Sequence, residues 1–148
     1  MMMSGNVVFV DTNVLIYANV ADAPLHEVAL SAIVSRYAAG VDIWISRQIL
    51  REYLAVLTRR DVIVEPKPAS LLVERIRFFE KYFHVAEDTP QVTEKLLSLV
   101  EQIPVGGKQI HDANIVATMQ TYGIVRLLTN NVSDFERFSD MIEILPLI

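Results

Sequence analysis

The sequence contains no cysteine, and this absence limits how the protein can be held together. Disulfide bonds and thiolate metal sites are excluded, so any bound metal must have oxygen or histidine ligands. A chain without cysteine also fits a cytoplasmic location. Long apolar runs are missing too, since stretches such as Val7–Val10 and Val14–Tyr17 are far shorter than the ~20 residues of a membrane helix. The chain is therefore not expected to cross a membrane.

The sequence contains fewer basic than acidic residues. The 13 Lys and Arg residues face 18 Asp and Glu residues, which gives a net charge of −5. Proteins that hold nucleic acid by a basic surface usually carry a strongly positive field, so this chain is not a passive basic clamp. If it binds RNA, a metal ion has to supply the attraction. A secretory signal is also lacking in residues 1–6, and we expect an unprocessed protein.

Hydrophobic residues, in contrast, are abundant. They make up 52% of the 148 residues, a content and a length typical of one folded domain. No repeat, low-complexity tract or polar linker divides the chain. Residues 1–148 are therefore predicted to form a single domain.

Short apolar runs rich in β-branched residues alternate with longer segments of helical periodicity. Strands are expected at residues 7–10, 43–45, 83–86, 126–129 and 142–145. Helices are expected at residues 14–18, 24–39, 46–57, 69–81, 89–102 and 108–122, with residues 130–134 forming a polar turn. This alternation predicts a three-layer α/β fold, in which helices cover both faces of a parallel sheet of about five strands. In such sheets, sites lie beyond the carboxyl ends of the strands.

Two acids are predicted to lie at that edge of the sheet. Asp11 directly follows the first apolar strand and is followed by Thr12 and Asn13, an arrangement that offers a carboxylate, a hydroxyl and an amide to a metal ion. Asp134 follows the fourth strand in a polar segment that also contains Thr129 and Asn131. The alternatives are a helix cap at Asp11 and simple turn chemistry around Asp134.

Two further acids are predicted to lie on helices. Asp112, in the first turn of its helix, shares a face with Ile115, Val116 and Met119, so it heads an apolar stripe. Its alternative role is to stabilise the helix N-terminus, a contribution of roughly 0.3–1 kcal/mol. Glu52 lies at the margin of the apolar stripe on its helix, and position alone leaves it an ordinary surface glutamate.

Together these motifs resemble the PIN domains, many of which are VapC-type toxins of toxin–antitoxin pairs. The family pattern is an apolar strand ending in Asp-Thr/Ser-Asn, a helical Glu near residue 50, a helix-initial Asp before small and apolar residues, and a late Thr-x-Asn-x-x-Asp-Phe segment. Matching segments occur in this order over essentially the whole chain, at residues 11–13, 51–53, 111–113 and 129–135.

The resemblance implies a metal-dependent ribonuclease and assigns roles to the motif residues. Its acidic pocket would consist of Asp11, Glu52, Asp112 and Asp134, as metal ligands and catalytic groups, with supporting roles for Thr12, Asn13, Thr129 and Asn131. Carboxylates about 5 Å apart repel one another by roughly 3 kcal/mol at an effective dielectric near 20. One or two divalent cations would remove this repulsion, and all-oxygen ligands suit Mg²⁺ or Mn²⁺.

The expected reaction is hydrolysis of an RNA phosphodiester by metal-activated water, which leaves 5′-phosphate ends. Lys108 is a candidate contact for substrate phosphate, and Arg47 and Arg51 could add to a positive rim; ordinary solvated charge is the alternative. His111 is left outside the catalytic set. A phosphatase is disfavoured because position 13 is Asn where a second acid would be needed.

Partners follow from the resemblance as well. A VapC-type toxin would be inhibited by a small cognate antitoxin and would form a homodimer. Apolar residues for such contacts occur in residues 28–37 and 50–57, although we expect most of them to belong to the core. The alternatives are a catalytically degenerate PIN fold acting as an RNA-binding or scaffold protein, and a housekeeping RNA-processing nuclease.

Overall fold

A five-stranded parallel sheet forms the centre of the structure. The computed structural model describes residues 6–59 and 67–148, so the expectation about the start of the chain lies mostly outside the described residues. The strands are β1 (Val7–Val10), β2 (Asp42–Ser46), β3 (His84–Ala86), β4 (Arg126–Thr129) and β5 (Glu143–Pro146), in the order β3-β2-β1-β4-β5. Every neighbouring pair is parallel. The predicted α/β class and parallel sheet are thus confirmed.

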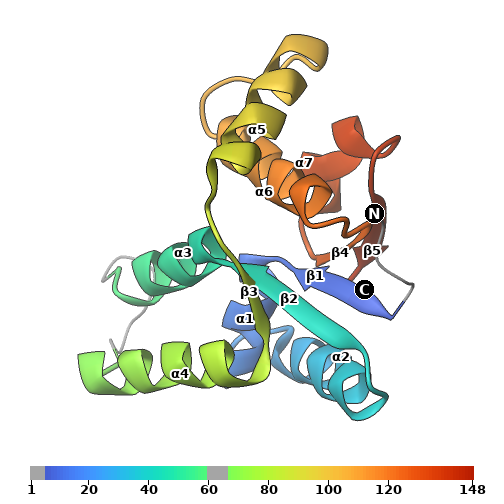
Figure 1. The fold of residues 1–148 in the computed structure, drawn as a ribbon. Coiled ribbons are helices and arrows are strands. Elements are labelled where there is room, and N and C mark those ends of the chain that lie inside the picture. The colour runs from blue at the N-terminus through green and yellow to red at the C-terminus, as the bar shows by residue number, and fades with distance from the viewer. Residues whose placement is uncertain (1–5, 60–66) are drawn as a thin grey trace.

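Helices cover both faces of this sheet. They are α1 (Thr12–Asn19), α2 (His26–Ala38), α3 (Arg47–Leu57), α4 (Ala69–Tyr82), α5 (Pro90–Gln102), α6 (Gln109–Thr121) and the short α7 (Val132–Phe135), followed by a 3₁₀ turn at Glu136–Phe138. In Figure 1, α1, α2 and α4 lie below the sheet, and α5, α6 and α7 lie above it. This arrangement agrees with the three layers predicted from the alternation of strands and helices.

Strand β1 is central because its sequence is apolar on both sides. All four of its residues are buried, and it pairs with β2 on one edge and β4 on the other. Phe9 lies opposite both Trp44 and Leu127 in this register. A parallel strand covered by helices on both faces must be apolar at every position, and this explains the unbroken run. The chain leaves the core at the end of β1, where Asp11 begins the site.

The helix boundaries follow the capping residues of the sequence. The Ser46 hydroxyl accepts a hydrogen bond from the backbone N–H of Ile49 (3.3 Å) and begins α3. Thr89 caps α5 in the same way. Gly123 follows α6 with a φ of 70°. Glycine adopts this left-handed conformation with little strain, so it suits the position just after the end of a helix.

Two expectations from the sequence were wrong. Residues 132–135 form α7, so Asp134 lies in a short helix and not in a turn; buried Phe135 and Phe138 hold this segment against the core. The apolar residues of α2 are largely outside the core, since Val34 is 55% exposed. On α3 the expectation holds, because Leu50, Tyr53 and Leu57 are buried.

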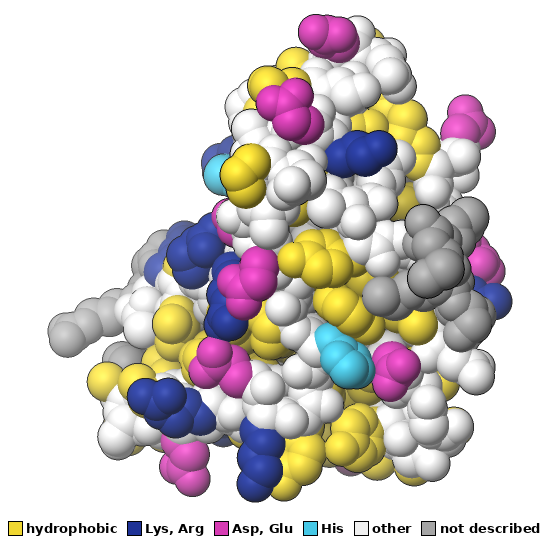
Figure 2. Space-filling view, in the orientation of Figure 1, with side chains coloured by type: hydrophobic (Ala, Val, Ile, Leu, Met, Phe, Trp, Pro, Cys, Tyr) yellow, Lys and Arg dark blue, Asp and Glu magenta, His cyan; other side chains and the backbone are white. Residues whose placement is uncertain are grey.

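The surface agrees with the charge balance of the sequence. Figure 2 shows cationic and anionic side chains interspersed on the face that it presents, with hydrophobic side chains gathered near the centre. Within the described ranges, no helix has the length and apolar character that a membrane span requires.

Candidate active site

Three of the four predicted acids line one pocket beyond the carboxyl end of β1. Asp11 follows β1 directly, and its backbone N–H donates to the carbonyl of Leu128 in β4 (3.0 Å). Glu52 comes from the second turn of α3 and Asp112 from the first turn of α6. The pocket has a volume of about 310 Å³ and is lined by Asp11, Thr12, Asn13, Ile16, Glu52, Ala55, Val56, Asp112 and Asn131. Residues 101 positions apart in sequence, 11 and 112, therefore share one cavity.

Asp11 is buried and tightly held. One carboxylate oxygen, Oδ1, accepts from the backbone N–H of Thr12 (2.8 Å), and Oδ2 accepts from the Thr129 hydroxyl (2.7 Å) and the Asn13 amide (2.9 Å). Burial raises the pKa of the Asp11 carboxyl above its usual value, while these hydrogen bonds oppose the rise. The helix cap considered as an alternative is present, because Asp11 caps α1, but the cap occupies only one of its two oxygens.

Glu52 is joined to Asp11 through Thr12. The Thr12 hydroxyl donates to Glu52 Oε1 (2.7 Å), while its backbone N–H donates to Asp11. Glu52 Oε2 accepts from the side-chain amide of Gln48 (3.0 Å). Both carboxylate oxygens of Glu52 are thus engaged within the pocket, and the interpretation of Glu52 as an ordinary surface glutamate is wrong.

The carboxyl of Asp112 is affected by all three of the other acids. Burial, and after it the negative charges of the other three acids, raise the pKa of the Asp112 carboxyl to about 7. Asp134 is the first of these charges, so it lies close to Asp112 although it does not line the pocket and is exposed. The four acids therefore act on one another, as expected of carboxylates that share a cleft.

The supporting residues tie α1 to the segment after β4. The Asn13 carbonyl oxygen accepts from the backbone N–H of Asn130 (3.0 Å), and Thr129 Oγ1 accepts from the backbone N–H of Asn131 (3.0 Å). Thr129 is fully buried beneath Asp11. Thr12, Asn13 and Thr129 thus contact the acids directly, whereas Asn131 reaches them through Thr129 and lines the pocket mouth.

The donor chemistry of the pocket fits a hard divalent cation. Carboxylate oxygens are the ligands that Mg²⁺ and Mn²⁺ prefer, and burial together with the charges of the neighbouring acids raises the pKa of Asp112, which a divalent cation would oppose. In the arrangement of residues 6–59 and 67–148, however, no three His, Asp or Glu side chains are placed to ligate one ion. Water molecules would complete the coordination, as they usually do for Mg²⁺.

The basic residues near the acids differ in their availability. Arg47 forms ion pairs with Glu80 and Glu87 (both 2.8 Å), and Arg51 approaches Asp88 (3.4 Å), so acids offset part of the charge that these arginines would bring to a positive rim. Lys108 is exposed at the start of α6.

A cationic side chain that acts on Asp112 was not predicted. Arg137 lowers the pKa of Asp112 and donates to the carbonyl of Pro104 (3.1 Å). Arg137 lies in the 3₁₀ turn, three residues after Asp134, and this closeness in sequence to a predicted acid could have identified it.

Two amide side chains beside the acids were also missed. Gln48 is 6% exposed and donates to Glu52, and Asn114 donates to Gln48 (2.7 Å). The sequence feature that could have identified them is their spacing from the acids, since Gln48 precedes Glu52 by four residues and Asn114 follows Asp112 by two. Side chains four apart share a helix face, but a partner on another helix is not visible in local spacing.

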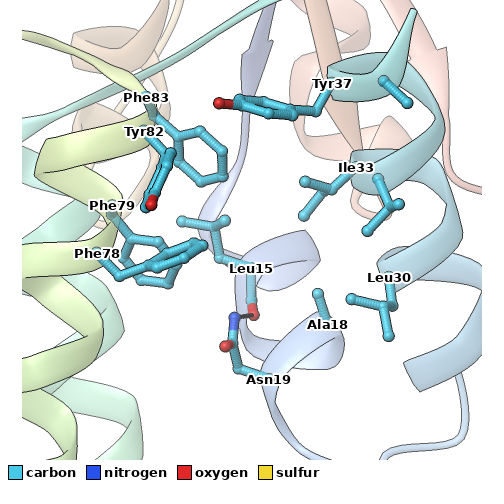
Figure 3. Close-up of a pocket in the computed structure, with 12 residues that line it drawn as sticks. Leu15, Ala18, Asn19, Leu30, Ile33, Tyr37, Phe78, Phe79, Tyr82 and Phe83 are labelled. Atoms are coloured by element: carbon cyan, nitrogen blue, oxygen red, sulfur yellow. Dashed lines mark hydrogen bonds between the residues drawn. The ribbon is translucent and has the colours of Figure 1, made fainter.

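A second, larger hollow lies away from the acids. It has a volume of about 390 Å³ between α1, α2 and α4, and its lining is almost wholly apolar. In Figure 3, Leu30, Ile33 and Tyr37 of α2 face Phe78, Phe79, Tyr82 and Phe83 across Leu15 and Ala18 of α1. Phe78 and Tyr37 are about half exposed, at 52% and 49%. This apolar groove has none of the acids, and we refer to it below as the α2–α4 groove.

Comparison with known proteins identifies relatives of this sequence and of this fold. The chain is 24% identical over 131 residues to Ribonuclease VapC24 of Mycobacterium tuberculosis. The aligned segment covers 87% of this chain and 89% of the relative. The structure of M. tuberculosis VapC20, described as a Sarcin-Ricin loop cleaving toxin, superposes with a TM-score of 0.65 at 21% identity, covering 94% of this chain and 99% of that one. A toxin–antitoxin complex from Klebsiella pneumoniae gives a TM-score of 0.63 at 20% identity, over 95% and 98% of the chains. Residues 8–140 match the model of the PIN domain, and the chain belongs to the PIN-domain family.

Proposed function

We propose that this protein is a divalent-metal-dependent endoribonuclease that acts in the cytoplasm as the toxin of a toxin–antitoxin pair. The observation that carries the proposal is the convergence of Asp11, Glu52 and Asp112 on one pocket, with Asp134 close enough to raise the pKa of Asp112. Similarity to VapC24, a ribonuclease by name, supports RNA as the substrate.

The chain itself holds the acids in place for this reaction. Asp11 is fixed by three donors and Glu52 by two, so neither carboxylate has to be ordered when substrate arrives. Burial and the neighbouring acids raise the pKa of Asp112 to about 7, and a divalent cation bound beside it would favour its charged form. A bound Mg²⁺ or Mn²⁺, as one ion or two, supplies Lewis-acid charge that activates water and stabilises the phosphate oxygens.

Substrate phosphate requires positive groups at the pocket mouth. Lys108 is exposed one turn before Asp112, and we propose that it contacts the RNA backbone. Arg137, which already acts on Asp112, is a second candidate. Because water, and not the RNA 2′-hydroxyl, attacks the phosphorus, the products carry 5′-phosphate ends.

The α2–α4 groove supports a protein partner. Monomeric proteins rarely expose a contiguous apolar groove of this kind without a use for it, and Val34, Leu30, Tyr37, Phe78 and Tyr82 are each at least 42% exposed. A solved relative of the same fold is a toxin–antitoxin complex. We propose that an apolar segment of the cognate antitoxin occupies the groove, and that α5, which exposes Leu97 and Val100, is available to a second copy of the chain in a homodimer.

The partner proposal predicts a separation of toxicity from inhibition. Expression of the wild type should arrest growth, and co-expression of the adjacent gene's product should relieve the arrest. Val34→Asp places a charge in the groove, where burial against an apolar partner is costly. We expect this variant to bind the antitoxin at least ~10-fold more weakly, since truncation or charging of a central contact costs about 2 kcal/mol or more. It should therefore arrest growth even with the antitoxin present.

Val73→Asp is the matched control for this experiment. Val73 is 50% exposed on α4 but does not line the groove, so the same change there should leave relief by the antitoxin intact. Equal relief of the two variants would contradict the groove as the docking site. Harmless expression of a wild type that cleaves RNA in vitro would contradict the toxin role.

A further inference from the structure

Gln48 joins the two helices that carry Glu52 and Asp112. It lies in the first turn of α3, one turn before Glu52, and only 6% of it is exposed. Its Nε2 donates to Glu52 Oε2 (3.0 Å) and to the backbone carbonyl of His111 in α6 (2.9 Å). Its Oε1 accepts from the side-chain amide of Asn114, also in α6 (2.7 Å). One buried amide thus contacts both helices at the level of the acids.

The partners of Gln48 fix which way its amide points. A carboxylate and a carbonyl only accept hydrogen bonds, so both must face the NH₂ group of Gln48. The oxygen of Gln48 is then directed at Asn114, which supplies an N–H. Both N–H groups of the amide are used, and no other side chain type of similar size can donate twice and accept once in this geometry.

The contact has a direct effect on Glu52. A glutamate side chain loses rotamer entropy when it is fixed in one conformation, so contacts that order Glu52 in advance favour ligand binding. The Thr12 hydroxyl holds Oε1 from α1, and Gln48 holds Oε2 from within α3, so the two bonds set the orientation of the carboxylate plane. Without Gln48, Glu52 would keep a single anchor.

The contact has a second effect on Asp112. His111 and Asn114 flank Asp112 on α6, and both are bonded to Gln48. The first turn of α6 is therefore tied to the first turn of α3, although the two segments are more than 60 residues apart in sequence. This tie determines how far Asp112 lies from Glu52 across the pocket.

We infer that Gln48 is a positioning residue, which sets the orientation of Glu52 and the distance between α3 and α6 so that acids from separate helices bind one divalent cation. The inference rests on the proposed metal dependence and adds a specific residue to it. Groups that orient metal ligands typically contribute 10–100-fold to metal affinity. A residue that only stabilised the fold would have no such effect.

The test compares Mn²⁺ binding to the full chain without RNA, by titration calorimetry, with thermal unfolding of the same samples. Gln48→Met keeps the length and helix preference of the side chain but removes its hydrogen bonds. We expect it to weaken Mn²⁺ binding at least ~10-fold. Asn114→Ala removes only the donor to Gln48, leaves Glu52 untouched, and should weaken binding by a smaller factor. It keeps the inference testable if Gln48→Met fails to fold.

Tyr53→Phe is the matched control. Tyr53 is a buried polar residue of the same helix, but its hydroxyl approaches Arg75 of α4 (3.5 Å), away from the acids. It should lower thermal stability slightly and leave Mn²⁺ affinity at the wild-type value. Wild-type Mn²⁺ affinity in both Gln48→Met and Asn114→Ala would overturn the inference about Gln48 and would leave the proposed function unaffected. A wild type that binds no Mn²⁺ would contradict the proposed function, and the inference with it.

Discussion

Asp112→Asn is expected to lower RNA cleavage by roughly 100-fold or more and, without metal, to raise the free energy of unfolding. Activity falls because the variant lacks a charge that the divalent cation needs. Stability rises because burial and three neighbouring acids oppose ionisation of Asp112, whose pKa is raised to about 7 from 3.8. Its carboxylate receives no hydrogen bond from any residue in the two described ranges, so the substitution removes repulsion and little else.

The stability gain should depend on pH. Between about pH 4 and pH 7 the unfolded chain releases the Asp112 proton while the folded chain retains it, so stability falls as pH rises through this window. One pKa unit corresponds to about 1.4 kcal/mol. Because solvent reaches the half-buried Asp112, we expect Asn to gain roughly 1 to 3 kcal/mol above pH 7. Below pH 4 the two proteins should be equally stable.

Urea unfolding at pH 5 and pH 8 in the presence of EDTA measures this effect. The wild type should lose more stability than Asp112→Asn between the two values. A smaller slope should remain in the variant, because burial also raises the pKa of Asp11. Parallel pH dependences in wild type and variant would show that Asp112 is not under repulsion. Asp22→Asn, on the exposed surface, is the control for the substitution itself and should match the wild type.

Asp11→Asn should also abolish cleavage, but with the opposite effect on stability. The two oxygens of Asp11 accept from three donors: the Thr12 N–H, the Thr129 hydroxyl and the Asn13 amide. An asparagine has one oxygen, so its NH₂ group must face a donor in either orientation. One buried donor is then left without an acceptor, which costs about 1–3 kcal/mol. Loss of the charge on Asp11 also removes the cost of burying that charge and its repulsion by Glu52, and we expect this gain to reduce the cost without reversing it.

Comparing the unfolding free energies of Asp11→Asn and Asp112→Asn tests the description of the site more strictly than either variant alone. Both are single Asp to Asn changes in one pocket and both should be inactive, so any difference in unfolding free energy reflects hydrogen bonding and burial. We expect Asp11→Asn to unfold at lower urea concentration than the wild type, and Asp112→Asn at higher concentration, at pH 8 in EDTA. Destabilisation of both proteins to the same extent would contradict the electrostatic description of the site.

The sequence predicts the part of the site that depends on strand ends. A buried parallel strand must be apolar on both sides, so the change from Val10 to Asp11 marks where the chain leaves the core. Caps such as Ser46 and Thr89 are local as well, because the side chain bonds to an N–H three residues later. These features need no knowledge of distant residues, and the helix starts predicted at residues 46 and 89 agree with the caps.

The contacts that the sequence did not reveal are long-range. Thr12 contacts Glu52 across 40 positions, and Gln48 contacts Asn114 across 66. Helical periodicity also leaves open which apolar stripe is covered by the fold, and this is why the exposed face of α2 around Val34 was assigned to the core. Glu52 shows the difference most clearly: its place on α3 suggests a surface residue, and only its bonds with Thr12 and Gln48 place it in the pocket.

Cleavage of a labelled RNA by the purified chain, with Mg²⁺, Mn²⁺ or EDTA and with the chemistry of the new ends determined, tests the central claim most directly. We expect cleavage with either ion, none in EDTA, and none with Asp11→Asn or Asp112→Asn. The upstream end of each downstream product should carry a 5′-phosphate. Equal cleavage in EDTA, wild-type activity in either variant, or 2′,3′-cyclic phosphate ends would contradict the claim.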